Sequence, residues 1–148
     1  MLKAYYIAYG SNMSVEDMKT RAPDARIVGT SMLNGWRLSL RKHATVEPCE
    51  GAVTPAVVWE ISERDEIELD SYEDYPGYYD KKIIPVEVLC RDGSRITLDA
   101  MVYIMVDGHP LRMPSPSYIE CLRKGYMGFG FPLEILENAI SECKSVEL

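Results

Sequence analysis

The sequence predicts an α+β fold with a mostly antiparallel or mixed sheet, because strand and helix patterns are interspersed along a chain of 148 residues. An Asp92-Gly93 pair between two long strand patterns indicates a tight hairpin, which joins antiparallel neighbours. The patterns show no regular β-α-β rhythm, which disfavours a doubly wound parallel sheet. The length is typical of one domain, and we expect a single domain over residues 1–148.

The first predicted strand covers residues 3–9 and stops at the turn-forming residues 10–12. Ser14 has the chemistry of a helix N-cap and is followed by two acidic residues. A short helix is therefore expected between Ser14 and Pro23.

Three further strands are expected at residues 26–32, 36–41 and 55–61, the second because apolar and polar residues alternate along it. Ser62 is a second candidate N-cap, and it begins a helix that must end before Pro76.

Two long strands are expected around the Asp-Gly hairpin, at residues 81–90 and 94–106. Pro85 cannot donate to a strand ladder, so it implies an edge or a bulge. Two helices are expected to close the chain, one bearing Tyr118 and the other beginning near Pro132.

The composition excludes several functional classes. A net charge of −7 disfavours nucleic-acid binding, which depends on Lys and Arg. No apolar run approaches the roughly 20 residues of a membrane span, so no membrane partner is expected. The N-terminus lacks a signal-peptide pattern, and a cytoplasmic location is the default expectation. The four cysteines form no C-x-x-C pair and have no histidine at zinc-ligand spacing, so no metal site is expected.

A first candidate site follows the first strand. Gly10 lets a ligand approach the main chain closely, and Ser11 and Asn12 add side-chain hydrogen bonds. A strand that turns into a helix start here would aim backbone N–H groups at a carboxylate or an oxyanion. The alternative is that this segment is only a turn.

Glu73 is the second candidate, at the expected end of the helix that follows Ser62. The negative end of the helix, the flanking Asp70 and Asp74, and burial among tyrosines would each disfavour its ionisation. A glutamate with a raised pKa can act as both base and acid near neutral pH. The alternative is an acidic helix end in solvent.

Tyr118 is the third candidate, because Pro114 and Pro116 stiffen the loop that leads to it. Its hydroxyl can then face a pocket, although a connector with a core tyrosine is the alternative. The chain has ten Tyr and two Phe, which suits a pocket that is apolar in shape but hydrogen-bonds its ligand. Strands alone explain many of these tyrosines.

Three segments, in this order, resemble motifs of the γ-glutamylcyclotransferase-like family, over about residues 5–136. Tyr9-Gly10-Ser11-Asn12 resembles its substrate loop, and Leu69-Asp70-x-x-Glu73 resembles the segment with its catalytic glutamate. Pro114-Ser115-Pro116-Ser117-Tyr118, with Gly125 and Phe131-Pro132-Leu133, resembles its C-terminal signature. Met13 departs from the usual leucine, a nearly volume-conserving change. The loop at residues 74–76 also departs and bears on the leaving group.

The resemblance implies a small mixed β-barrel with surrounding helices, and an enzyme that forms 5-oxoproline without a metal or cofactor. The substrate's α-amine attacks its own γ-carbonyl, and Glu73 carries the proton. The substrate-binding residues that the resemblance implies are Tyr9, Gly10, Ser11, Asn12, Met13, Tyr79 and Tyr118.

The family also implies a homodimer. The substrate is left open among a γ-glutamyl amino acid, a γ-glutamyl amine and a biosynthetic intermediate. A different class of function is a non-catalytic module that binds γ-glutamyl ligands on the same fold. Glu73 favours the enzyme, because a binder of an anionic group gains little from another carboxylate.

Overall fold

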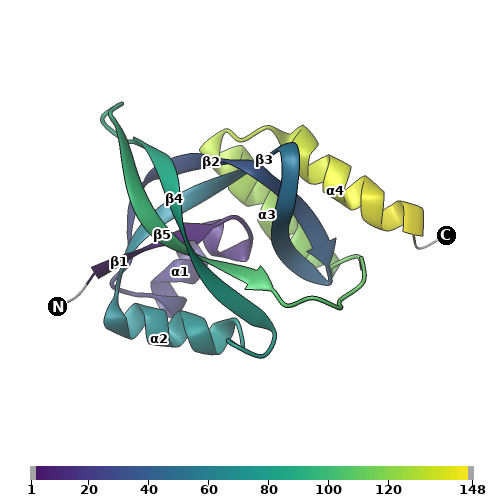
Figure 1. Cartoon of the computed structure of the whole chain (residues 1–148), viewed down its shortest axis with the longest axis horizontal. Helices are drawn as coiled ribbons and strands as arrows, with labels where there is room; N and C mark the ends of the chain where they lie inside the picture. The colour runs from purple at the N-terminus through teal and green to yellow at the C-terminus, as the bar shows by residue number, and fades with distance from the viewer. Residues whose placement is uncertain (1–2, 147–148) are drawn as a thin grey trace.

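A closed barrel of five strands, with helices packed around it, is the architecture of the computed structural model, which describes residues 3–146 (Figure 1). In chain order the elements are β1 (Lys3–Ala8), the 3₁₀ turn η1 (Ser11–Met13), α1 (Val15–Arg21), β2 (Arg26–Arg41), β3 (His43–Ser62), α2 (Glu63–Tyr72), β4 (Tyr79–Cys90), β5 (Arg95–Met105), α3 (Pro116–Phe129) and α4 (Leu133–Val146). This confirms the predicted α+β class and the expected mixed barrel with surrounding helices.

The strand order around the barrel is β1-β3-β2-β4-β5. Every neighbouring pair is antiparallel except β1 and β5, which are parallel with Tyr6 opposite Met101. Helices α1 and α2 pack together at the lower left of Figure 1, and α3 and α4 pack together on the right. Within residues 3–146, no helix is both long and apolar enough to cross a membrane.

β2 and β3 form one long hairpin, and the sequence prediction was wrong about its extent. The strands predicted at residues 26–32 and 36–41 are one strand, β2, whose register shifts between Asn34 and Trp36. Gly35 lies at this irregularity with a φ of 85°, and its turn-like character divided the pattern.

The strand predicted at residues 55–61 also begins much earlier, at His43. Its first half contains Pro48, which obscured the strand pattern. β1 pairs only with residues 57–62 of β3, so Pro48 lies where β3 has β2 as its single strand neighbour. A proline is tolerated on such an edge because no ladder hydrogen bond is lost there.

The barrel closes through a short ladder between β2 and β4. Their paired residues are Gly29 with Cys90 and Thr30 with Leu89. A Cβ atom at Gly29 would lie 2.1 Å from the backbone oxygen of Leu89, so only glycine permits this approach. Pro85 lies outside this ladder and pairs only with β5, as the expected edge position requires.

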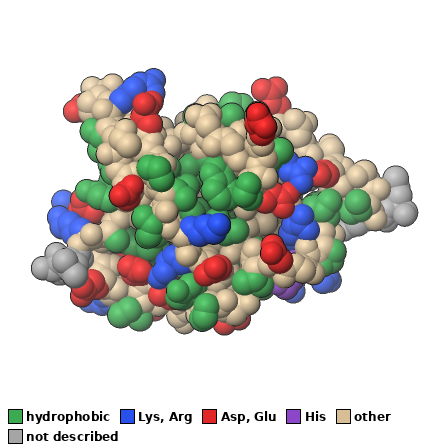
Figure 2. Space-filling model, in the orientation of Figure 1, with side chains coloured by type: hydrophobic (Ala, Val, Ile, Leu, Met, Phe, Trp, Pro, Cys, Tyr) green, Lys and Arg blue, Asp and Glu red, His purple; other side chains and the backbone are tan. Residues whose placement is uncertain are grey.

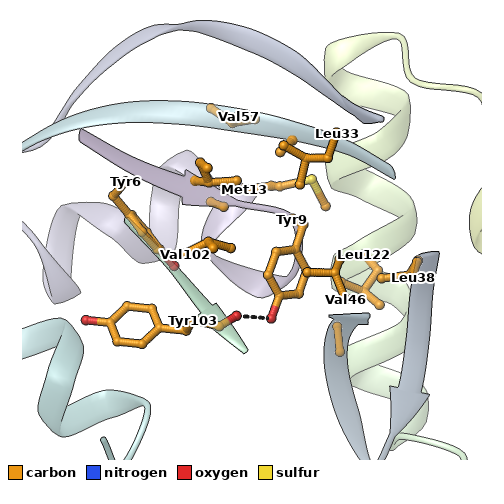
Figure 3. Close-up of a cluster of buried hydrophobic side chains, with 14 of the residues drawn as sticks. Tyr6, Tyr9, Met13, Leu33, Leu38, Val46, Val57, Val102, Tyr103 and Leu122 are labelled. Atoms are coloured by element: carbon orange, nitrogen blue, oxygen red, sulfur yellow. Dashed lines mark hydrogen bonds between the residues drawn. The ribbon is translucent and has the colours of Figure 1, made fainter. Parts of the chain in front are cut away.

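The core fills the barrel and continues beneath α3 (Figure 3). Its aliphatic part includes Leu33, Val57 and Leu122, each almost completely buried. Tyrosines occupy the other side of the cluster, where the Tyr9 hydroxyl donates to the backbone oxygen of Tyr103 at 2.6 Å. The end of β1 therefore enters a polar part of an otherwise apolar interior.

Candidate active site

The predicted site residues, with the exception of Met13, line one pocket at the end of β1. Including its mouth, this pocket encloses about 290 Å³. Its lining residues are Tyr6, Ile7, Tyr9, Gly10, Ser11, Asn12, Ala44, Glu73, Tyr79, Tyr103 and Tyr118. The pocket thus combines residues from strands, from the end of a helix and from the start of another helix.

The glycine at position 10 borders the pocket closely. A Cβ atom there would lie 3.3 Å from the Cβ of Ala44 and 3.5 Å from the hydroxyl of Tyr118. The backbone oxygen of Gly10 accepts from the N–H of Met13 at 3.1 Å, which closes the turn η1. Any larger residue at position 10 would therefore reduce the space between the loop and Tyr118.

Met13 lies outside the pocket and is 1% exposed. It packs against α3, where a Cβ atom added to Gly125 would lie 3.0 Å from the Met13 methyl carbon. Its contact with α3 anchors the loop, and its predicted contact with substrate stays a prediction.

Glu73 follows the last residue of α2, and its N–H donates to the oxygen of Leu69 at 2.9 Å. A capping box between Ser62 and Asp65 fixes where this helix begins. The ten residues of α2 then carry the chain to the pocket, where Glu73 is half-buried. The helix boundaries agree with those that the sequence predicted.

Burial raises the pKa of Glu73 to about 7, and the nearby charge of Arg21 partly opposes this rise. The sequence predicted that the pKa of Glu73 would rise. It also attributed part of this rise to the flanking carboxylates, which are not among its causes. Asp70 instead accepts from Lys81 at 2.8 Å and from the Tyr103 hydroxyl at 2.6 Å. Asp74 is exposed to solvent.

Glu73→Gln is expected to stabilise the fold at pH 8 and to leave it nearly unchanged at pH 4. Because its folded pKa is raised, the carboxyl contributes stability that is present at low pH and lost as pH rises to about 7. The loss is on the order of 3 kcal/mol for a shift of this size. Melting temperatures of both proteins at the two pH values test this. If the melting temperatures of the two proteins differ by the same amount at pH 4 and at pH 8, this expectation is wrong.

The pocket tyrosines differ in what their hydroxyls can offer a ligand. The Tyr118 oxygen accepts from the N–H of Ala44 at 2.9 Å, so its own proton stays available to a ligand. The Tyr79 hydroxyl donates to the oxygen of Ala44 at 2.6 Å, and Tyr9 donates to Tyr103. Because their protons are already used, the hydroxyl groups of Tyr9 and Tyr79 can only accept hydrogen bonds from a ligand. Burial raises the pKa of all three, which keeps them neutral.

Sequence reasoning missed four residues that line the pocket, Tyr6, Ile7, Ala44 and Tyr103. Tyr6 and Tyr9 are three positions apart and would face opposite sides of a regular strand, but β1 ends at Ala8 and both reach the pocket. Ala44 lies in the part of β3 that was not predicted. The excess of tyrosine was the available signal for Tyr6 and Tyr103, without indicating which tyrosines gather here.

A larger groove, of about 1160 Å³ when its mouth is likewise included, lies outside this pocket. Apolar side chains gather in the hollow between the β4–β5 hairpin and the β2–β3 hairpin, with acidic and basic side chains interspersed around it (Figure 2). The groove is lined in part by Trp36, Lys82, Ile104 and His109, and Glu73 and the loop at residues 10–12 lie outside it. The pocket at the end of β1 is therefore the better candidate for chemistry.

Comparisons with known proteins match most of the chain. A family model described as "Gamma-glutamyl cyclotransferase, AIG2-like" matches residues 6–120. A human protein named gamma-glutamylcyclotransferase is 28% identical over 146 residues, which covers 90% of this chain and 75% of that protein. The mouse protein of the same name is 29% identical with the same coverage.

Solved structures agree with this match. One described as gamma-glutamyl cyclotransferase has a TM-score of 0.75 at 26% identity, and the match covers 93% of this chain and 86% of the other. The structure of YkqA from Bacillus subtilis has a TM-score of 0.76 at 19% identity, covering 98% of this chain and 55% of the other. The latter likeness concerns the fold alone.

Proposed function

The chain belongs to the γ-glutamyl cyclotransferase, AIG2-like family, and from this premise we propose that it is an enzyme that converts a γ-glutamyl compound into 5-oxoproline and a free amine or amino acid. The observation that carries the proposal is the carboxyl group of Glu73, whose pKa burial raises to about 7. At neutral pH both of its protonation states are populated, which a group that takes and returns a proton requires.

The proposed reaction moves protons from one nitrogen to another. The α-amine attacks the γ-carbonyl carbon, a carbon–nitrogen bond of the lactam forms, and the bond to the departing nitrogen breaks. Two protons leave the α-ammonium as the lactam nitrogen forms, and two reach the departing nitrogen when it leaves as an ammonium. Glu73 carries these protons in turn, first as base and then as acid.

The pocket supplies complementary groups for a folded γ-glutamyl chain. The hydroxyl oxygens of Tyr9 and Tyr79 can accept from the substrate ammonium, and the Tyr118 hydroxyl can donate to a substrate oxygen. Gly10 leaves room for the ligand between the loop and Tyr118. Holding the amine against its own carbonyl is a proximity effect that accelerates ring closure.

The alternative is a non-catalytic module that binds γ-glutamyl ligands in the same pocket. A half-buried carboxyl group beside an anionic ligand would weaken such binding, which favours the enzyme. The homodimer and the cytoplasmic location stay predictions.

Incubation with a panel of γ-glutamyl amino acids and γ-glutamyl amines is expected to release 5-oxoproline with one equivalent of the departing amine. Mass spectrometry of both products tests this, with a boiled sample as the control for spontaneous cyclisation. Saturable binding of panel members without product would support the binding module instead. Absence of both binding and product would refute the proposed function.

A further inference from the structure

Tyr6 lines the same pocket as Glu73, Tyr9, Tyr79 and Tyr118. We infer that Arg21 and Asn12 fix the Tyr6 hydroxyl as a hydrogen-bond donor to the γ-carbonyl oxygen of the substrate. This inference rests on the proposed function and adds a further residue to it.

A chain of two hydrogen bonds decides the direction of the Tyr6 hydroxyl. Arg21 Nη1 donates to Asn12 Oδ1 at 2.6 Å, and Asn12 Nδ2 donates to the Tyr6 oxygen at 2.9 Å. A guanidinium can only donate, so the oxygen of the Asn12 amide must face Arg21 and its NH₂ group must face Tyr6. The Tyr6 oxygen is therefore an acceptor in this pair, and its own proton is left for another partner.

Asn12 and Arg21 are each held in place by other contacts. Asn12 is 2% exposed, and its backbone oxygen accepts from Trp59 Nε1 at 3.1 Å. The Arg21 guanidinium lies 4.0 Å from the centre of the Tyr72 ring and 3.8 Å from an Asp17 carboxylate oxygen. This arrangement leaves the Asn12 amide little freedom to turn over, so the direction of the chain is fixed before substrate binds.

The Tyr6 hydroxyl is suited to donate into the pocket. Tyr6 is 4% exposed, and burial raises its pKa well above the ordinary value, so the hydroxyl stays protonated. Within residues 3–146 no recorded hydrogen bond uses this proton, and a substrate oxygen in the pocket can accept it. The positive charge of Arg21 at the far end polarises the chain and strengthens the final donor.

The charge of Glu73 indicates which substrate oxygen Tyr6 meets. Glu73 lines the same pocket as Tyr6, and its negative charge contributes to the raised pKa of Tyr6, so the α-carboxylate of the substrate would be repelled at this position. The γ-carbonyl oxygen is neutral in bound substrate and becomes negative only as Glu73 takes up a proton. A fixed donor aimed at charge that develops during reaction stabilises the transition state more than the bound substrate.

Tyr6→Phe is therefore expected to lower kcat by about 10²–10³-fold, the size typical of losing one oxyanion donor, with little change in KM. Tyr5→Phe is the matched control, because Tyr5 is the preceding residue of β1 and lies outside the pocket. Melting temperatures of both variants ensure that the folded proteins are compared.

Arg21→Met separates a positioning role from a structural one. Because the charge of Arg21 also lowers the pKa of Glu73, kcat is compared at the pH optimum of each variant. Compared in this way, Arg21→Met should lower kcat in the wild-type background and have no further effect in the Tyr6→Phe background, because the two residues then act through one hydroxyl. Arg21→Lys, which keeps a donor and a charge, should recover part of the rate. A merely structural Arg21 would lower kcat by the same factor in both backgrounds, and that result would refute its role.

Two results would overturn the role of Tyr6 itself. The first is a folded Tyr6→Phe variant that has the kcat and KM of the wild type. The second is a variant with a raised KM and an unchanged kcat, which would mean that the hydroxyl stabilises bound substrate and the transition state equally. A wild-type protein that releases no 5-oxoproline would instead overturn the proposed function and this inference together. The two failures are therefore distinguishable.

Discussion

Replacing Glu73 with glutamine should lower kcat by about 10²–10⁴-fold, the range expected when a general acid–base group is lost. Glutamine has nearly the same shape and can hydrogen-bond, but it cannot accept the proton of the α-ammonium. The pocket and the fold should persist, because burial disfavours the charge that the substitution removes. Rates of 5-oxoproline release at saturating substrate measure the effect.

Glu68→Gln is the matched control for this substitution. Glu68 is exposed on the same helix, α2, so the chemical change is identical while the pocket is untouched. Glu68→Gln should keep the wild-type rate. If Glu73→Gln also cyclises its substrate at the wild-type rate, Glu73 is not the proton carrier and the mechanism is wrong.

Replacing Gly10 with valine should weaken 5-oxoproline binding by about a hundredfold. The new Cβ would lie 3.3 Å from the Ala44 Cβ and 3.5 Å from the Tyr118 hydroxyl, and the two methyl groups would extend further into the pocket. A hundredfold loss corresponds to about 2.8 kcal/mol of binding free energy. Overpacking against Ala44 and Tyr118 should also lower the stability of the fold, by about 1–3 kcal/mol. Calorimetric titration below the melting temperature measures the loss.

Ser14→Ala separates a substrate loop from a simple turn. The Ser14 hydroxyl accepts from the N–H of Asp17 at 3.1 Å and caps α1. Losing this cap should cost about 0.5–2 kcal/mol of stability and little affinity. If folded Gly10→Val also binds 5-oxoproline as tightly as the wild type, the loop does not contact the ligand.

Local chemistry explains which parts of the site could be predicted from sequence. Ser14 and Ser62 act as the helix caps that their residue types indicated, and α2 therefore ends beside Glu73 at the expected position. The loop at residues 10–12 and Tyr118 lie at a strand end and a helix start, where short motifs are informative. These features depend on residues that are close together in the sequence, which is why they could be predicted from it.

The missing parts depend on partners that are distant in sequence. Ala44 reaches the pocket because β2 and β3 form one long hairpin, which Gly35 and Pro48 concealed. Tyr6 is placed by its parallel pairing with Met101, and no local pattern specifies that register. Register in a closed barrel follows from the packing of the whole sheet.

The hydrogen bonds within the pocket have a consequence for how the protein is made. Tyr9 and Tyr103 are 94 positions apart, and Ala44 and Tyr118 are 74 positions apart. Contacts between such distant segments close late in folding, because the chain entropy lost in each loop must be offset by packing. A nascent chain therefore lacks the pocket until α3 has been synthesised and docked. Recovery of ligand binding during refolding should consequently report the final assembly step, after helices α1 and α2 have formed.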